Sequence, residues 1–278
     1  MKIEVAEHAG YCYGVERALK LAQETIGKRP GPICTLGPII HNPQVVDWLK
    51  NKGIGFVDNL NLMDNGTIII RSHGIDPKIK IKAKRKGIEV VDATCPFVKK
   101  AQHCAGKLVE EGYNLIIVGE RNHPEVIGIL AYAGGNAVVA EDIEDIKKLP
   151  NFDKVGVVVQ TTQPVENLKK VVNELIPKAE EIKVFNTICD ATVKRQISAN
   201  NLAKKADVML VIGGKNSANT SRLAQICRDV NPKTYHIEIA SEINEKWFDN
   251  IGFVGVAAGA STPDWIIDEV VKSISKLK

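Results

Sequence analysis

The chain has 278 residues, of which 44% are hydrophobic and 25% are charged, and these values are ordinary for a globular protein. No apolar run is long enough to span a bilayer, and the N-terminal MKIEVAEHAGYCYG lacks the apolar core of a signal peptide. We therefore expect a cytoplasmic protein without a membrane segment. The net charge of +4 is too small to favour nucleic acid as a partner, and it fits an anionic small ligand or an acidic protein.

Three segments share one predicted plan, in which a β-rich stretch is followed by a cysteine and then by a helical pattern. They are residues 3–22, 88–112 and 182–206, and their cysteines are Cys12, Cys95 and Cys189. A basic residue stands five positions after each cysteine, namely Arg17, Lys100 and Lys194. An internal repeat of this kind indicates that one structural unit recurs along the chain.

A second element repeats in residues 33–46, 115–128 and 209–223, each of which reads as a strand, a glycine, a polar loop and the start of a helix. The glycines Gly37, Gly119 and Gly213 lie 25, 24 and 24 residues after the repeated cysteines. Four residues after each glycine comes a polar side chain: His41, His123 and Ser217.

A third element, in residues 67–74, 155–164 and 252–263, is a strand that ends in polar residues. These ends are centred on His73, on Thr161 and Thr162, and on Ser261. The alignment of the repeats places Thr162 opposite His73 and Ser261. After the first of these strands comes a basic run that we interpret as an exposed helix face, made of Lys82, Lys84, Arg85 and Lys86.

Alternating strands and helices predict an α/β fold with parallel sheets, because the continuous aliphatic runs suit strands buried on both faces. We expect three similar domains, residues 1–94, 95–188 and 189–278, in a pseudo-threefold arrangement. The polar residues named above would then lie at the C-terminal ends of parallel strands, where ligands bind in such sheets.

The three repeated cysteines are candidate metal ligands, because a helix N-terminus favours the thiolate form. Pseudo-threefold packing would bring them to one centre, where three thiolates suit an iron–sulfur cluster or a zinc ion. The other three cysteines have no equivalents in the repeats and are expected to be small buried hydrophobic residues: Cys34, Cys104 and Cys227.

The strand-end loops also form a candidate anion site. Histidine, serine and asparagine side chains beside helix N-termini can hold a diphosphate, and the candidates are His41, His73, His123, Ser217, Asn219 and Ser261. The segment GGKNSANTS lacks the GxxxxGK[ST] pattern, which argues against a nucleotide site. Glu125 follows His123 by two residues and is a candidate proton donor, and Thr161 and Thr162 offer hydroxyls to a substrate.

The chain closely resembles the 4-hydroxy-3-methylbut-2-enyl diphosphate reductase (LytB) family over essentially its whole length. The motifs that carry the resemblance include GYCYGVERA, LGPIIHNPQVV, RSHG, DATCPFV, GERNHPEV, QTT, NTICDAT, GGKNSANTSRL and GASTPDW. The resemblance implies three α/β domains around a central 4Fe–4S cluster held by Cys12, Cys95 and Cys189, with a fourth iron that has no protein ligand.

The resemblance also implies roles for the loop residues. The diphosphate would be bound by His41, His73, His123, Ser217, Asn219 and Ser261, and Glu125 would supply protons with Thr161 in its hydrogen-bond network. Many relatives have a second serine where this chain has Ala218, which leaves only backbone groups for binding at that position.

The implied activity is reductive dehydroxylation of an allylic diphosphate to isopentenyl and dimethylallyl diphosphate, the last step of the non-mevalonate pathway. The chain has no flavin or nicotinamide fingerprint, so the electrons are expected from a ferredoxin- or flavodoxin-type protein. Two other readings keep the cysteines as ligands: a redox or oxygen sensor with a cluster, and a zinc hydrolase with water in the open position.

Overall fold

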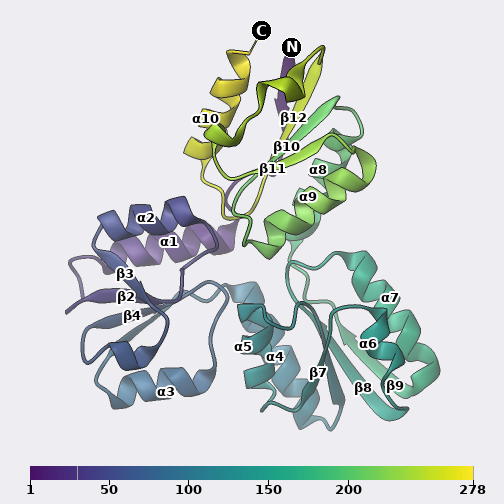
Figure 1. Ribbon diagram of the computed structural model, residues 1–278. Helices are drawn as coiled ribbons and strands as arrows, with labels where there is room; N and C mark the ends of the chain where they lie inside the picture. The colour runs from purple at the N-terminus through teal and green to yellow at the C-terminus, as the bar shows by residue number, and fades with distance from the viewer. Residues whose placement is uncertain (30, 278) are drawn as a thin grey trace. The chain divides into compact units, whose positions relative to one another are not determined.

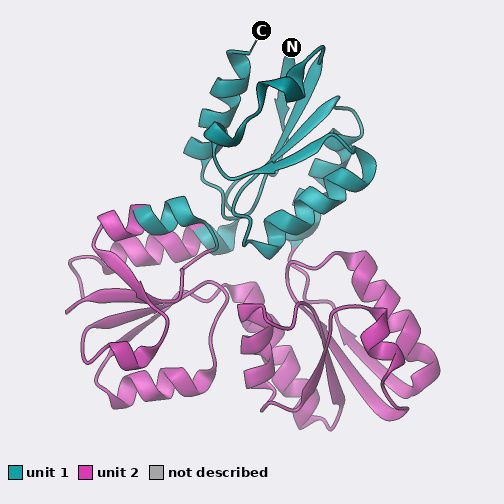
Figure 2. Cartoon of the chain, viewed as in Figure 1, with its two compact units in different colours: residues 1–15, 41–47, 190–278 teal, residues 16–40, 48–189 magenta. Residues whose placement is uncertain are grey.

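The computed structural model describes residues 1–29 and 31–277, which fold into three four-stranded parallel sheets covered by helices (Figure 1). The chain forms two compact units (Figure 2). One comprises residues 1–15, 41–47 and 190–278 and holds one sheet, and the other comprises residues 16–40 and 48–189 and holds two. Among the described residues, no helix has both the length and the apolar content that a membrane span requires.

The first sheet of the two-sheet unit has the strand order β3-β2-β4-β5, and all its pairings are parallel. Its strands are β2 (Ile33–Leu36), β3 (Ile54–Val57), β4 (Thr67–Ile70) and β5 (Glu89–Asp92). Helix α3 (Pro77–Arg85) lies wholly within this unit, whereas α1 (Tyr13–Thr25) and α2 (Pro43–Asn51) each begin in the one-sheet unit and end in this one. All four residues of β4 are buried, because a central parallel strand is covered by helices on both faces.

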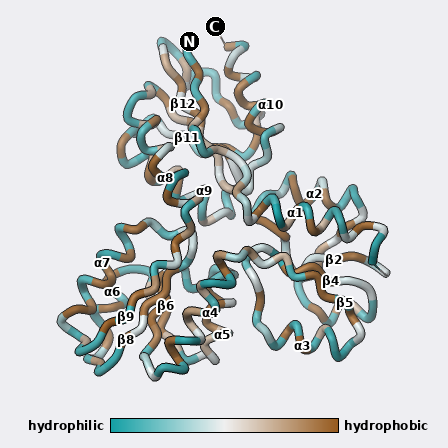
Figure 3. Tube along the Cα trace, turned by 180° about the vertical axis from the view of Figure 1, so that it is seen from behind, coloured by the Kyte–Doolittle hydropathy of each residue, from teal (hydrophilic) through white to brown (hydrophobic). Residues whose placement is uncertain are grey.

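The second sheet of this unit repeats the same order as β7-β6-β8-β9. Its strands are β6 (Asn114–Val118), β7 (Ala137–Ala140), β8 (Phe152–Val159) and β9 (Ala179–Phe185). Its helices are α4 (Pro96–Glu110), α5 (Pro124–Tyr132), α6 (Ile143–Lys147) and α7 (Val165–Leu175). Figure 3 shows strongly hydrophobic residues along β4 and β6, each of which is one of the two inner strands of its sheet.

The third sheet has the order β1-β12-β10-β11 and is completed by the N-terminal strand. Its strands are β1 (Lys2–Val5), β10 (Val208–Ile212), β11 (Thr234–Ile237) and β12 (Phe253–Ala258). Its helices are α8 (Asp190–Ala203), α9 (Ala218–Val230) and α10 (Asp264–Ser275). Four short 3₁₀ helices complete the described elements: Leu60–Leu62, Ile176–Lys178, Ala240–Glu242 and Glu245–Phe248.

Strand β10 shows why these aliphatic runs form inner strands. Val208, Leu210 and Ile212 pack on one face against β12 and α10, whereas Met209 and Val211 pack on the other against α8 and α9. Successive side chains of a strand point to opposite faces, so a strand between two helical layers needs apolar residues at every position. The predicted α/β class with three similar parallel-sheet units is confirmed.

The sheets add one finding about domain boundaries. Strand β1 lies within the range 1–94 but pairs with β12, from Lys2 opposite Phe253 to Val5 opposite Val256. The first sheet, β2 to β5, is built without it. The predicted domain bounds, residues 1–94, 95–188 and 189–278, remain a prediction. That prediction did not include the pairing of β1 with β12.

Candidate functional site

Each repeated cysteine lies immediately before a helix, and its backbone N–H is held in the same way. The N–H donates to the carbonyl oxygen of a residue just after the strand beside it, at 2.9 Å for Cys95 and Ser72 and at 3.1 Å for Cys189 and Thr161. In the other unit, the N–H of Cys12 donates to Ala260 at 3.2 Å. The repeat therefore places the three thiols at equivalent strand-to-helix turns, as the sequence predicts.

The strand-end turns beside these cysteines are also equivalent. Each is a four-residue turn closed by a hydrogen bond from the fourth N–H to the first carbonyl, at 3.0, 3.0 and 3.1 Å, in Arg71–Gly74, Gln160–Gln163 and Gly259–Thr262. The third position of each turn is His73, Thr162 or Ser261. The alignment of these three residues in the sequence is thus matched by one backbone geometry.

Glu125, in the first turn of α5, is hydrogen-bonded to Thr161, which follows the end of β8. The Glu125 side chain is only 1% exposed, and its two oxygens accept from the backbone N–H of Thr161 at 2.7 Å and from its hydroxyl at 2.8 Å. Burial raises the pKa of the Glu125 carboxyl to about 7, although the two bonds from Thr161 lower it. Near neutral pH this carboxyl is therefore divided between its protonated and ionised forms.

The structure gives different contacts to the two adjacent threonines, whose roles residue spacing alone did not separate. Thr161 contacts Glu125 directly, whereas the Thr162 hydroxyl accepts a hydrogen bond from the Gln160 side-chain amide at 3.0 Å. Gln160 in turn accepts from the backbone N–H of Glu120 at 2.9 Å. The hydroxyls of Thr161 and Thr162 thus have different hydrogen-bond partners.

His123 is the N-terminal cap of α5, and its ring lies against that of His73. Its Nδ1 accepts from the backbone N–H of Glu125 at 3.1 Å, so the neutral ring carries its proton on Nε2. The two imidazoles meet edge to face with centroids 5.5 Å apart. One cap thus fixes both the position of Glu125 and the nitrogen of His123 that can donate to an anion.

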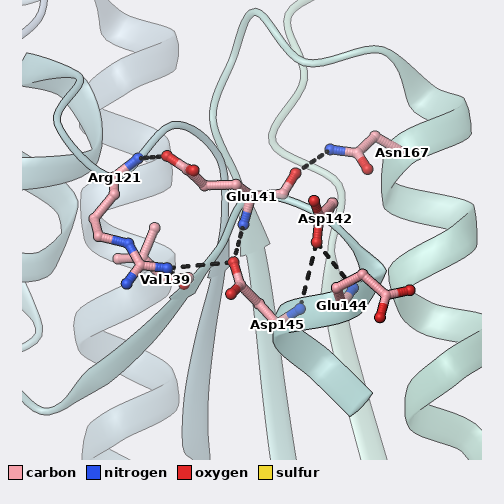
Figure 4. A network of polar contacts seen from close by, with 7 residues as sticks. All are labelled: Arg121, Val139, Glu141, Asp142, Glu144, Asp145 and Asn167. Atoms are coloured by element: carbon pink, nitrogen blue, oxygen red, sulfur yellow. Dashed lines mark hydrogen bonds and ion pairs between the residues drawn. The ribbon is translucent and has the colours of Figure 1, made fainter. Parts of the chain in front are cut away.

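The loop that carries His123 is anchored by an exposed polar network (Figure 4). The backbone N–H of Arg121 donates to Glu141 at 2.7 Å, and its guanidinium donates to the Val139 carbonyl and to Asp145, both at 3.2 Å. Asp145 also accepts from the N–H of Glu141 at 3.0 Å. These contacts join the loop after β6 to the end of β7.

The His73 turn is packed against α5 through two small residues. Gly74 has φ +76°, and a Cβ on it would lie 2.5 Å from the amide nitrogen of the buried Gln102. A Cβ on Gly128 of α5 would lie 3.2 Å from the same nitrogen. A larger residue at either position would therefore have to displace the Gln102 side chain of α4, and at Gly74 the positive φ would add backbone strain.

The other predicted anion-binding residues lie in the one-sheet unit. Ser217 caps α9 by accepting from the N–H of Thr220 at 3.4 Å, and the Ser261 hydroxyl donates to the His41 carbonyl at 3.3 Å. Asn219 is 9% exposed, and its amide nitrogen has no hydrogen-bond partner among the described residues. This buried donor fits a group that binds a ligand.

The first repeat departs from the other two at its helix cap. His123 and Ser217 cap their helices, but α2 is capped by Asn42, whose side chain accepts from the N–H of Val45 at 3.1 Å. His41 therefore precedes the cap by one residue. Its carbonyl is packed so closely against Gly214 that a Cβ there would lie 2.6 Å away.

Two arginines support the cysteine loops, and one of them was missed from the sequence. Arg17, on the helix after Cys12, donates to the Thr94 carbonyl beside Cys95 at 3.2 Å. Arg195, on the helix after Cys189, is 4% exposed and donates to the Gly10 carbonyl at 2.6 Å. The five-residue spacing from the cysteine pointed to Lys194, which is exposed, whereas Arg195 lies on the buried side of α8. The helical periodicity of buried positions would have predicted this residue better than the spacing did.

Comparison with known proteins gives consistent matches over the whole chain. The model of the family described as LytB protein matches residues 3–275. A 4-hydroxy-3-methylbut-2-enyl diphosphate reductase of Geotalea uraniireducens is 52% identical over 277 residues, covering 100% of this chain and 98% of that protein. The reductase of Aquifex aeolicus is 49% identical over 278 residues, covering 99% and 96%.

Two solved structures are similar as well. One is described as the terminal enzyme of the non-mevalonate pathway and matches with TM-score 0.73 and 49% identity, covering 99% of both chains. The other is an E-1-hydroxy-2-methyl-but-2-enyl-4-diphosphate reductase from Plasmodium falciparum, which matches with TM-score 0.92 and 28% identity, covering 99% of this chain and 88% of that one.

Proposed function

The chain belongs to the LytB family, and on that premise we propose that it reduces 4-hydroxy-3-methylbut-2-enyl diphosphate to isopentenyl and dimethylallyl diphosphate. The reaction consumes two electrons and two protons, and the hydroxyl oxygen leaves as water. It is the last step of the non-mevalonate pathway, in agreement with the description of a similar solved structure. The observation that carries the proposal is the buried Glu125 carboxyl, held by Thr161 beside the His123 cap.

We propose a 4Fe–4S cluster as the cofactor, with Cys12, Cys95 and Cys189 as its ligands. All three are partly exposed at equivalent turns, none of them is in a disulfide, and thiolates are the usual ligands of such clusters. When bound, the cluster would supply the two electrons and an iron without a protein ligand, which acts as a Lewis acid.

The remaining cysteines have properties that fit packing instead. Cys104 and Cys227 are 7% and 0% exposed, and burial raises the pKa of Cys227 to about 12. Cys34 is partly exposed, so the expectation that it is fully buried was wrong, but desolvation still raises its pKa. A thiol with a raised pKa is a poor metal ligand, because the thiolate is the form that binds.

The proton for the leaving oxygen is proposed to come from Glu125. A carboxyl with a pKa of about 7 is protonated often enough near neutrality to donate, and ionises readily once it has done so. Thr161 holds both carboxyl oxygens and so fixes their direction. Thr161 is also proposed to contact the substrate, and so is Thr162 from the adjacent position.

The diphosphate is proposed to bind to the residues that the family resemblance implies: His41, His73, His123, Ser217, Asn219 and Ser261. Two features of individual residues support this. The cap contact places the proton of the neutral His123 ring on Nε2, and Asn219 has a buried amide without a partner in the described part of the chain. Imidazole and amide N–H groups are suitable donors to phosphate oxygens.

The electrons are proposed to come from a ferredoxin- or flavodoxin-type protein, since the sequence has no flavin or nicotinamide fingerprint. The cytoplasmic location expected from the sequence stays a prediction.

The first test is anaerobic purification followed by iron, sulfide and turnover measurements. We expect about four iron and four sulfide per chain, the count set by the cluster type, and turnover of the allylic diphosphate with dithionite and methyl viologen. Replacement of Cys95 by Ser should reduce the iron content, whereas replacement of the buried Cys104 by Ala should not. A colourless protein with one zinc and no sulfide would refute the proposal and favour a hydrolase. A cluster without binding of the diphosphate would favour a sensor.

A further inference from the structure

The positive charge of the chain is concentrated in one short segment that the proposed chemistry does not use. Residues 76–86 contain six cationic side chains and one acidic side chain, a net charge of +5. The whole chain has a net charge of +4, so the remaining residues together carry −1. This segment is helix α3 with its two caps, Asp76 and Lys86.

The outer face of α3 presents this charge to solvent. Lys78, Lys84 and Arg85 are exposed, and none of the three has an ion-pair partner in the part of the chain that the structure describes. Ile81 lies among them and is 52% exposed. A single exposed apolar residue is ordinary on a protein surface, so the unpaired positive charge is the feature that points to an acidic partner.

Beside α3 lies a cleft of about 410 Å³ within the two-sheet unit. Its charged lining residues are the cationic Lys80, Lys99 and Lys107 and the acidic Asp92 and Glu110. Lys80 and Lys99 both contact Asp92, at 2.9 and 3.0 Å. Burial raises the pKa of Asp92, but hydrogen bonds from Thr94, Lys80 and Lys99 outweigh it and hold this pKa well below its usual range.

The cleft is connected to a proposed cluster ligand by a short series of contacts. Asp92 accepts from the backbone N–H of Thr94 at 3.0 Å, and Thr94 is bonded covalently to Cys95. On the other side, Lys99 lies one helical turn beyond Cys95, about 6 Å along the axis of α4. Two residues that line the cleft, Asp92 and Lys99, are therefore close in the chain to Cys95, one of the proposed cluster ligands.

We propose that the exposed face of α3 and the adjoining cleft are the docking surface for a small acidic electron-carrier protein. This inference rests on the proposed function. A reduced one-electron carrier would dock, transfer its electron towards Cys95 and leave oxidised, so that two carriers are oxidised for each substrate reduced. Complementary charge accelerates and orients such short-lived encounters, and α3 offers it without involving substrate-binding residues.

The test compares two electron sources on two charge variants. The docking variant carries Lys78→Glu, Lys84→Glu and Arg85→Glu. The matched control carries Lys170→Glu, Lys272→Glu and Lys276→Glu, which are exposed lysines on α7 and near the end of α10 and give the same change in net charge. Each variant is assayed with dithionite and methyl viologen, and with a reduced plant-type ferredoxin at low and high salt.

We expect the docking variant to lose roughly ten- to hundredfold in kcat/KM for ferredoxin at low salt, with a flattened salt dependence, because electrostatic steering changes association rates by such factors. Turnover with methyl viologen should stay unchanged, and the control variant should resemble the parent protein with both donors. An Ile81→Ala variant should weaken ferredoxin binding without changing the charge.

Equal ferredoxin kinetics for the docking and control variants would overturn the docking proposal. So would unchanged ferredoxin kinetics accompanied by a changed oligomeric state or by loss of bound RNA, since these would assign α3 to a second copy or to nucleic acid. Failure of the parent protein to turn over with methyl viologen would instead refute the proposed function, so the two failures are distinguishable.

Discussion

At the scale of single residues, the buried Glu125 carboxyl has a pKa well above its ordinary value. Its burial and its two bonds from Thr161 place a proton donor at the edge of a parallel sheet. Glu125→Gln keeps the size of the side chain but removes the transferable proton. We expect turnover with methyl viologen to fall roughly 10²- to 10⁴-fold while iron and sulfide contents stay unchanged. Glu269→Gln, at an exposed site on α10, is the control.

The same group predicts a pH dependence with a definite sign. Its folded-state pKa of about 7 lies above the ordinary value of 4.5, so the protonated donor is lost as pH rises through 7, and activity should decline on the alkaline side. Between pH 4.5 and 7 the folded protein binds the proton more tightly than the unfolded chain, so this group's contribution to stability decreases as pH rises. Urea titrations at several pH values should show this slope in the parent protein and its loss in Glu125→Gln.

At the scale of elements, the helix that follows one cysteine supports a loop that carries another. Arg195 of α8 is buried and bonded to the Gly10 carbonyl, two residues before Cys12. Arg195→Gln should lower the free energy of unfolding by about 1.5–3 kcal/mol, the usual value of a hydrogen bond to a charged group. It should also speed the loss of iron, whereas Arg195→Lys should restore part of both.

The exposed Arg228→Gln on α9 is the matched control for that experiment. If denaturation curves and iron retention of Arg195→Gln match those of Arg228→Gln, the buried bond to Gly10 has no supporting role, and the loop before Cys12 is held by other contacts.

At the scale of the whole molecule, the main departure from a simple reading of the chain is that its N-terminal strand completes the third sheet. The N–H of Ala6, just after β1, donates to the Val256 carbonyl at 2.8 Å, and Ala6 is 8% exposed. Ala6→Pro removes this donor and should cost roughly 1–3 kcal/mol of stability by leaving the carbonyl unsatisfied.

Val5→Pro is the comparison for Ala6→Pro, because alternate N–H groups of an edge strand point to solvent and Val5 is 41% exposed. Denaturation and hydrogen exchange in β12 would measure both variants. Equal effects of the two prolines would contradict the pairing of β1 with β12 as described.

Four features could be predicted from the amino-acid sequence: the repeat, the parallel α/β class, the placement of Cys12, Cys95 and Cys189 before helices, and the alignment of His73, Thr162 and Ser261. These follow from periodicity and spacing, which are local properties of the chain. The pairing of β1 with β12, the capping of α2 by Asn42 rather than His41, and the burial of Arg195 rather than Lys194 became apparent only once the elements were placed in space. Each of these choices is between near neighbours in sequence or between distant partners. It is decided by which side of an element is buried and by which buried polar group needs a partner, and neither is determined until the elements have packed.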